Sequence, residues 1–432
     1  MWLGFWLKII FIVNYYYYAF FEGAGDIFEK IDLEKRLILL DEAFLISIIA
    51  FSSYLLAVIC KDFFFRNFQL SPLEDLKSSK KAIVNKFQNF VIIILFILII
   101  FTAFFNLDNL IYQRGLKSQS EFNFIFNGTI KWLLLFGFSS IICLFLFFNL
   151  SNKIKIYQLA FFSIFETFIS NISYLSRGMI FNALSIFYGL YKSNKIYKLK
   201  LKPKFFIIYF LTIFIFFFVS VSSINYLRHN FYFYNFIEKK DNNKEKIDIF
   251  DKETQDKKIV VEKRYHTLES ALHEFYFLAI NRWVGIDAVL STSANKEKNW
   301  NTFVNSFTEE YNPKRLPYYE RVIQQREIGL NESQINYGIT TPGIISFLFY
   351  SGSKIFLSIS FFLLIISMLF FEKYILRSTT NLIFCALIIQ QVAYRLIHFG
   401  YMPLNSYMFF GTIFFTIVLH QLVLRILKNI DL

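Results

Sequence analysis

Apolar runs long enough to cross a lipid bilayer recur along most of this chain, and one long polar segment interrupts them. A helix needs about 20 apolar residues to cross the hydrocarbon core. Ten runs meet or approach this length, at residues 2–20, 37–60, 88–106, 129–149, 156–173, 178–191, 205–224, 353–371, 379–396 and 405–426. The pattern predicts an all-α, polytopic integral membrane protein with about 10 transmembrane helices.

Two of these runs, 156–173 and 178–191, are short for two crossings. Both fit within residues 156–191, whereas two spans need about 40 residues. Short tilted helices and a re-entrant pair are therefore alternatives. The first run contains Lys8 and shows no small-residue cleavage site, which favours a retained span over a signal peptide.

The loops on one side of the predicted bundle are rich in lysine and arginine. Cytoplasmic loops of membrane proteins carry this excess. If the spans alternate, five basic sets share one side: Lys61, Arg66, Lys77, Lys80, Lys81 and Lys86; Lys153 and Lys155; Lys192, Lys195, Lys198, Lys200, Lys202 and Lys204; Lys373 and Arg377; Arg425 and Lys428. We therefore expect both termini in the cytoplasm and the polar segment on the outer side.

The polar segment divides the chain into three parts. It covers residues 225–341 and separates an N-terminal transmembrane bundle, residues 1–224, from a C-terminal one, residues 342–432. A run of Lys, Asp and Glu from residue 238 to 258 predicts a mobile linker near its start. The segment as a whole is predicted to form a large, partly helical periplasmic loop.

Apolar residues at helical spacing predict two amphipathic helices in this loop, around residues 268–279 and 300–307. We expect them to lie on the outer membrane surface, above a cavity between the spans. A short apolar stretch follows Pro342 and is flanked by Gly343 and Gly352. It is either a re-entrant half-helix or a flexible lead into the next span.

The composition agrees with a membrane protein and excludes an ordinary soluble one. Hydrophobic residues make up 56% of the 432 residues and charged residues 18%, below the roughly 25% of soluble proteins. The net charge of +13 follows from the basic loops, so we expect no nucleic-acid partner. Cys60, Cys143 and Cys385 all fall in apolar runs, which argues against disulfides and thiolate metal sites.

Four ionisable residues are predicted to converge on the outer side: Arg177, Arg282, Arg395 and His398. Ionisable groups at membrane depth are costly and usually face a polar site. Guanidinium groups bind phosphate in a bidentate manner and keep their charge. The pattern therefore indicates a phosphate-bearing substrate at the membrane surface.

Each of these candidates also has a purely structural interpretation. Arg177 either marks the end of a span or extends to the interface. Arg282 pairs with Glu274 or Asp287 on a solvated helix. His398 is an interfacial residue bonded to the backbone. These interpretations stay open at the level of sequence.

The other histidines do not form a recognisable metal site. His266 and His273 lie seven residues apart on one helix face, without a carboxylate pattern of metal type. His420, in mid-span, is interpreted as a residue that hydrogen-bonds between helices. The chain contains neither GxxxxGK[ST] nor GxGxxG. We therefore expect no metal, no cofactor and no coupling to nucleotide hydrolysis.

Four short segments carry a resemblance to a known family. They are SRG (176–178), RWVG (282–285), GITTPGIISFLFYSGS (338–353) and RLIHFGYMP (395–403). With the span pattern and one large late outward loop, they resemble the O-antigen polymerase group, the integral-membrane polymerases of oligosaccharide repeat units. The O-antigen ligases are similar at a greater distance. The resemblance covers most of the chain in architecture, while the motifs are short.

The resemblance implies a metal-independent glycosyl transfer at the periplasmic face of a bacterial inner membrane. Donor and acceptor would be oligosaccharide repeat units carried on undecaprenyl diphosphate. The family's essential arginines map to Arg177 and Arg282. The full set of diphosphate-binding candidates is Arg177, Arg264, Arg282 and Arg395. The catalytic candidates are Arg177, Arg282, His398 and Glu274, with His266 and His273 as alternative bases.

Other functions fit the same pattern. An O-antigen ligase would transfer a finished glycan to a different acceptor. A lipid-glycan flippase or other transporter would typically show an internal repeat and charges at mid-membrane, and the two halves show no convincing repeat. A non-catalytic membrane scaffold is a further alternative. For a polymerase, a regulator of polysaccharide chain length is a plausible partner besides the membrane lipid.

Overall fold

The computed structural model describes residues 33–64, 78–113, 120, 122–176, 178–241, 286–310, 317–325, 342–400 and 403–429. Within these ranges all regular structure is helical, without strands. Six helical segments are long and apolar enough to cross a membrane: Ile38–Lys61, Asn89–Asp108, Phe124–Phe148, Pro203–Ile224, Lys354–Thr379 and Pro403–Ile426. The prediction of a helical membrane protein is confirmed at this level.

The helices cover the predicted apolar runs, although several extend beyond the predicted ends. Nine of the ten runs coincide with helices, and the first run, residues 2–20, lies outside the described residues. The helices are α3 (Leu33–Phe64), α4 (Ser78–Asp108), α5 (Phe124–Trp132), η3 (Leu133–Gly137), α6 (Phe138–Phe148), α7 (Lys153–Ser173), α8 (Ile180–Tyr197), α9 (Pro203–Asp241), α12 (Ile286–Ala294), α13 (Trp300–Phe307), η4 (Tyr319–Ile323), α14 (Gly343–Phe349), α15 (Lys354–Thr379), α16 (Leu382–Ile397) and α17 (Pro403–Asn429). The two η elements are π-helical turns.

Polar side chains define where several helices begin. Asn152 accepts a hydrogen bond from the N–H of Lys155 at the start of α7, over 3.3 Å. Asn381 accepts from the N–H groups of Ile383 and Phe384 at the start of α16, over 3.0 and 3.1 Å. These caps satisfy N–H groups that have no partner within the helix. Short polar turns therefore separate consecutive apolar helices.

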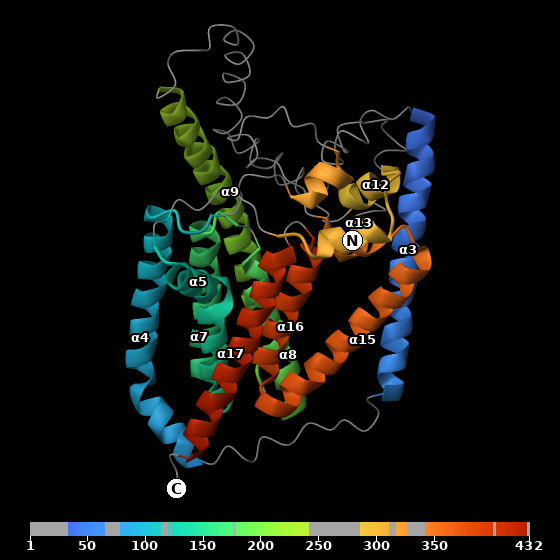
Figure 1. The fold of residues 1–432 in the computed structure, drawn as a ribbon. Helices are drawn as coiled ribbons and strands as arrows, with labels where there is room; N and C mark the ends of the chain where they lie inside the picture. The colour runs from blue at the N-terminus through green and yellow to red at the C-terminus, as the bar shows by residue number, and fades with distance from the viewer. Residues whose placement is uncertain are drawn as a thin grey trace.

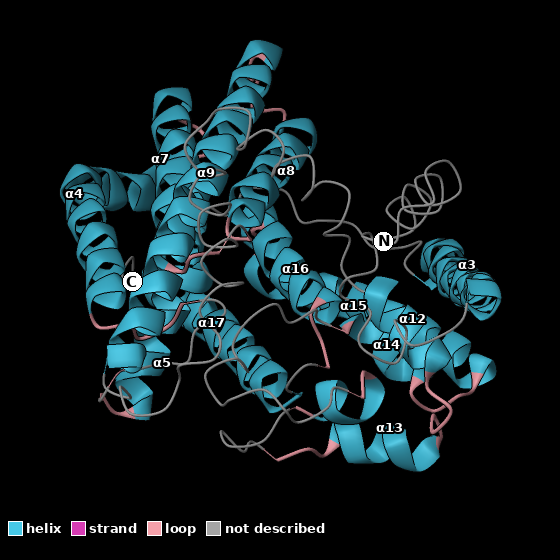
Figure 2. Cartoon of the chain, turned by 90° about the horizontal axis from the view of Figure 1, so that it is seen from above, coloured by secondary structure: helices cyan, strands magenta, loops and turns pink. Residues whose placement is uncertain are grey.

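The short runs 156–173 and 178–191 form two separate helices, α7 and α8. Both pack inside the bundle, and α16 lies directly against α8. A Cβ atom at Gly189 of α8 would lie 2.6 Å from Cα of Ile383 in α16, so the two backbones approach closely because Gly189 has no side chain. Figure 2 shows α16 in the middle, with α4, α7 and α9 on one side and α3 on the other. We call α6, α7, α8 and α16 the central bundle.

A second packing unit joins α3 and α15 to the short helices of the polar segment. Its core includes Ala43 and Ile46 of α3, Leu290 of α12, Phe349 of α14 and Leu357 of α15. Figure 1 shows α12 and α13 at one end of the bundle, beside the upper part of α3. We call α12, α13, η4 and α14 the cap.

Two predictions about short helices can be compared with the cap. The amphipathic helix expected around residues 300–307 is present as α13, whereas the one expected around 268–279 lies outside the described residues. The stretch after Pro342 forms a separate seven-residue helix, α14, with five of its residues buried. It is therefore a distinct buried helix rather than a flexible lead into α15. A turn at Gly352, where φ is +71°, separates the two helices.

The helix α9 continues to Asp241, beyond residue 224 where the apolar run ends. No glycine or proline occurs between residues 204 and 241, so nothing in the backbone stops the helix there. The change from apolar to polar composition therefore falls inside one continuous helix. The expected linker at 238–258 lies mostly outside the described residues.

Candidate functional site

Three of the four segments that carry the family resemblance meet at the cap end of the bundle. A Cβ atom at Gly178 would lie 2.8 Å from Cζ of the Tyr394 ring. A Cβ atom at Gly400, where φ is +96°, would lie 2.7 Å from Cδ2 of Phe347 and 3.0 Å from Cγ of Pro342. The C-terminal turn of α16 is thus contacted by the α7–α8 turn and by the start of α14. Segments far apart in the sequence form one local structure here.

The fourth segment, RWVG at 282–285, lies outside the described residues, but the helix that follows it belongs to the same structure. Thr292 on α12 and Ser346 on α14 share a hydrogen bond between their hydroxyl oxygens, at 2.8 Å. Ser346 Oγ also donates to the carbonyl of Ala288, at 3.0 Å. All three residues are buried. The start of the described chain after RWVG is therefore bound to α14.

The buried residue Asn171 accepts two of the hydrogen bonds that hold the α7–α8 turn. Its main-chain carbonyl accepts from the N–H of Ser176 at 3.0 Å, and its side-chain Oδ1 accepts from the N–H of Met179 at 2.9 Å. Buried N–H groups in a turn need such acceptors. Asn171 therefore positions both flanks of the SRG segment, while Arg177 itself lies outside the described residues.

Arg395 is half-buried between α16 and α17. Its Nε donates to Ser406 Oγ at 2.9 Å, and its guanidinium carbon lies 5.8 Å from the centre of the Phe409 ring. This environment combines a polar partner with an aromatic face, as is common for arginine. The side chain therefore contributes to packing between two helices, at the end where an anionic substrate was expected.

His398 ends α16 and is half-buried. Its Nδ1 lies 2.9 Å from the main-chain carbonyl of Tyr394, and its ring centre lies 4.4 Å from that of Tyr394. A carbonyl only accepts hydrogen bonds, so Nδ1 carries a proton, and a neutral ring has its lone pair on Nε2. This geometry matches the structural interpretation of His398, and it also fixes the tautomer in which Nε2 is the basic nitrogen of a neutral ring.

The structure thus brings two predicted site residues together, Arg395 and His398, one helical turn apart. The other candidates lie outside the described residues, namely Arg177, Arg264, His266, His273, Glu274 and Arg282. Among the described residues, no group of three or more His, Cys, Asp or Glu side chains is arranged to hold a metal ion.

His420 occupies the position expected of a residue that joins helices. Its Nε2 lies 3.5 Å from Nδ2 of Asn381, and its ring stacks on Phe384 at 3.8 Å with an interplanar angle of 9°. Both partners belong to the N-terminal part of α16. His420 therefore links α17 to α16 within the bundle, and the sequence interpretation is confirmed.

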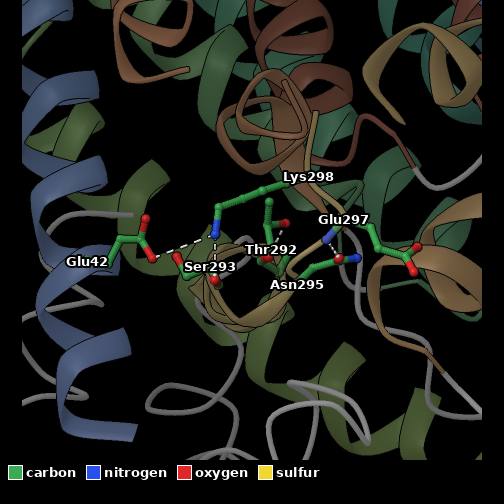
Figure 3. Close-up of polar contacts among 7 residues, drawn as sticks. Glu42, Thr292, Ser293, Asn295, Glu297 and Lys298 are labelled. Atoms are coloured by element: carbon green, nitrogen blue, oxygen red, sulfur yellow. Dashed lines mark hydrogen bonds and ion pairs between the residues drawn. The ribbon is translucent and has the colours of Figure 1, made fainter. Parts of the chain in front are cut away.

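Lys298 is a cap residue that the sequence pattern did not single out. Figure 3 shows its ammonium group between α3 and α12. Nζ donates to the carbonyl of Ser293 at 2.7 Å and lies 3.9 Å from Oε2 of Glu42. Burial lowers the pKa of Lys298, and the Glu42 carboxylate raises this pKa in part. The lysine ties the cap to α3.

One of the two partners of Lys298 is indicated by local sequence and the other is not. A cation after a helix C-terminus is a recognisable signal because the last carbonyl groups carry partial negative charge. The pairing with Glu42 is different, since the two residues belong to distant parts of the chain. Only tertiary structure brings them together.

A second residue that sequence reasoning missed is Glu166 of α7. It is fully buried and is the only acidic residue between Lys153 and Ser173. A lone carboxyl group in an apolar run is a recognised signal of a functional or structural polar site. This signal was available in the sequence.

No protein-family model, curated protein or solved structure matches this chain. The assignment of the site therefore depends on the chain's own residues. At the cap end, Arg395 and His398 place a cation and an imidazole beside the turn that contains SRG. Such a set is suited to binding an anion and to moving a proton at the membrane surface.

Proposed function

We propose that this protein polymerises lipid-linked oligosaccharide repeat units into O-antigen or a related surface polysaccharide. The reaction would take place at the periplasmic face of a bacterial inner membrane. A membrane-like helical architecture and the resemblance of four short segments to O-antigen polymerases support the proposal. Both termini would lie in the cytoplasm, and residues 225–341 would form the periplasmic loop. The remaining predicted runs would bring the number of spans to about ten.

The observation that carries the proposal is the meeting of the resembling segments. SRG, the stretch after Pro342 and the segment that begins at Arg395 lie far apart in sequence, yet Gly178 contacts Tyr394, the residue directly before Arg395, and Gly400 contacts Phe347. Segments that resemble a family only by chance have no reason to share one location. Their clustering favours a common site at the cap end.

In the proposed reaction, arginines hold the diphosphate of the donor. Arg177 and Arg282 would stabilise negative charge on the departing undecaprenyl diphosphate, with Arg264 and Arg395 as further ligands. The bond between the anomeric carbon and the diphosphate oxygen breaks, and a bond to the acceptor hydroxyl oxygen forms. The acceptor proton passes to a base.

His398 is the base candidate whose geometry can be described. With Nδ1 donating to the carbonyl of Tyr394, a neutral ring offers Nε2 as the proton acceptor. Glu274, His266 and His273 are the alternatives. The role of His398 predicts that His398→Gln reduces the reaction while leaving lipid-linked substrate bound.

Membrane-facing helices would hold the polyprenyl chains. Only 11% of the apolar window in α15 is buried inside the protein, and Ile355, Ile359 and Leu363 are among its exposed residues. Two substrates held in the same membrane leaflet are concentrated near one another, which favours reaction by proximity. Exposed apolar helices support the use of lipid-linked substrates.

A transporter of lipid-linked glycans is the second candidate function. The buried Glu166 favours it, because intramembrane carboxyl groups are common in transport pathways. Against it, Arg395 and His398 lie at one end of the bundle, where a transferase site is expected. The two candidates differ in the product that accumulates when the protein is missing.

The test is electrophoresis of surface polysaccharide from cells in which the gene is deleted. Complementation uses the wild type, Arg177→Ala, Arg282→Ala and His398→Gln at equal protein levels. The matched control is Arg377→Ala, because Arg377 is an exposed arginine in the last turn of α15. A polymerase predicts that deletion leaves a core with one repeat unit and that only wild type and Arg377→Ala restore the ladder.

Two other results would replace the proposal. If the deletion leaves core without repeat units while lipid-linked polymer accumulates, the protein is a ligase. Lipid-linked single units retained on the cytoplasmic side would identify a flippase. An unchanged ladder after deletion would contradict any role in that polysaccharide.

A further inference from the structure

A buried polar cluster lies inside the central bundle and has no role in the proposed reaction. At its centre, the two carboxyl oxygens of Glu166 each bond to a serine. Ser139 Oγ of α6 lies 2.5 Å from Oε2, and Ser170 Oγ of α7 lies 3.0 Å from Oε1. All three side chains are fully buried. A carboxyl group with this degree of burial is rare unless something compensates its charge.

The cluster continues from Ser139 to α8 and α16. Asn182 Nδ2 lies 3.4 Å from Ser139 Oγ and donates to the carbonyl of Leu135 at 2.7 Å. Leu135 belongs to η3, a π-helical turn whose altered hydrogen bonding allows side chains to reach main-chain carbonyls. Gln391 of α16 donates to Oδ1 of Asn182. One polar network therefore connects five helical segments, namely η3, α6, α7, α8 and α16.

Among the residues that the structure describes, no cation is placed to neutralise Glu166. The described ion pairs do not involve Glu166. Cys143 of α6 is the titratable neighbour on that helix, and from α9 Tyr209 bonds to Ser163, one turn before Glu166. The described part of α4 from Asn89 to Leu107 carries no ionisable residue. From α8 and α16 the network residues are amides.

The partners of Glu166 favour the charged form only weakly. Ser139 and Ser170 both donate to the carboxyl oxygens, which stabilises a carboxylate, but a hydroxyl group can also accept and therefore does not exclude the carboxylic acid. A guanidinium group or several N–H donors would have stabilised the charged form more strongly. Burial away from water is the larger effect on Glu166, and it disfavours an uncompensated charge.

We propose that Glu166 is a proton-binding site inside the bundle and is held as a neutral carboxylic acid at the pH where ordinary carboxyl groups are ionised. The proton comes from solvent and adds to one carboxyl oxygen; no other bond changes. The site does not depend on the polymerase reaction and would serve equally in a transporter.

The position of the site suggests what its proton state controls. Ser170, which bonds to Glu166, directly precedes Asn171, which holds the α7–α8 turn. A neutral Glu166 allows α6, α7 and α8 to pack closely beneath this turn. Loss of the proton would place a charge there and draw in water or a cation, which would loosen the flanks of the SRG segment.

Infrared spectroscopy of the full-length protein, purified in a detergent without carbonyl groups, tests the proposal. At about pH 7.5, well above the ordinary glutamate value of about 4.3, the wild type is expected to show the carbonyl band of a neutral carboxylic acid. The band should shift in heavy water and be missing in Glu166→Gln. The matched control Glu297→Gln, which changes an exposed glutamate, should retain it.

Absence of the band from the wild type at about pH 7.5 would overturn the proposal, since an ordinary carboxyl group is ionised there. A band that persists unchanged in folded Glu166→Gln would overturn it as well. If Glu166→Gln does not fold, Glu166→Asp replaces it, and a shifted band in that variant assigns the proton to this position. If the band does not shift in Glu166→Asp, the protonated carboxyl group belongs to another residue and the proposal is overturned.

Discussion

Hydrogen bonds join helices in both the central bundle and the cap, but the cap adds close contacts between aromatic rings. In the central bundle, polar side chains from different helices bond to one another, as Asn182 bonds to Gln391. In the cap, aromatic rings supply much of the contact between helices. Phe347 of α14 lies 4.9 Å from Phe399, 5.2 Å from Tyr350 and 5.5 Å from Phe303, measured between ring centres.

The two regions also differ in their backbone. Close helix contact in the central bundle depends on a glycine with ordinary helical geometry, Gly189, opposite Ile383. The cap and the turn beneath it depend on glycines with positive φ, among them Gly343, Gly352 and Gly400. The bundle is therefore sensitive to side-chain volume, whereas the cap is sensitive to backbone conformation as well. The following substitutions test this difference.

Gly189→Ala is expected to have the largest effect on stability. The new methyl group would lie 2.6 Å from Cα of Ile383, and a main-chain atom cannot move aside without separating α8 from α16. We expect a loss of about 2–3 kcal/mol, measured by thermal unfolding in detergent. The matched control is Gly128→Ala in α5, which meets no atom within 4 Å and should be neutral or stabilising by up to about 1 kcal/mol. Equal effects of both substitutions would refute the close contact.

Asn182→Ala is expected to cost about 2 kcal/mol, because it removes a donor to Leu135 and an acceptor for Gln391 in a buried site. The same unfolding assay measures it. A double variant with Gln391→Leu removes both partners of one bond, so its loss should be smaller than the sum of the single losses. Strict additivity would show that the two amides do not interact.

Gly400→Ala tests the cap. The residue has φ of +96°, which costs an L-residue about 1–2 kcal/mol, and its methyl group would displace the Phe347 ring. Because Phe347 is a side chain that can shift, we expect a smaller loss of global stability than for Gly189→Ala. The polysaccharide ladder should nevertheless shorten, since His398 lies two residues away. A polysaccharide ladder of normal length would show that this turn is not needed for the proposed function.

Lys298→Met is expected to have the smallest effect on stability. The ion pair with Glu42 spans 3.9 Å and is partly exposed, and such pairs contribute at most about 1 kcal/mol. A double-mutant cycle with Glu42→Gln measures the coupling by thermal unfolding. Limited proteolysis at the cap should change more than the unfolding temperature does, because Lys298 joins the cap to α3. An unchanged cleavage pattern would contradict that role.

The sequence predicted the helices well because the signal is local. An apolar run of sufficient length forms a helix in a membrane whatever its neighbours are, and α3, α4, α15 and α17 follow their predicted runs. Apolar residues spaced by three and four positions likewise predicted α13. The less regular stretch after Pro342 left two alternatives, and its burial against α12 and α16 shows that it is a packed helix.

The candidate site was predictable only in part. Arg395 and His398 were found because ionisable residues stand out in an apolar sequence, yet their partners Ser406 and the carbonyl of Tyr394 were not foreseen. Glu166 was missed, although its isolation in an apolar run is the same kind of signal. The partner of a polar group depends on which helices are neighbours, and a single sequence does not show which helices pack together.

By itself, the sequence determined that this chain is a helical membrane protein, which stretches form its apolar helices, and which residues have the chemistry to bind an anion. The tertiary structure alone decided that Gly178 lies against Tyr394, that Gly400 lies against Phe347, and that Glu166 is enclosed by hydroxyl groups. The physical reason is the separation along the chain over which each kind of interaction acts. Hydropathy and helix formation act between residues close in sequence, whereas packing and hydrogen bonding in the bundle join residues that only the folded chain brings into contact.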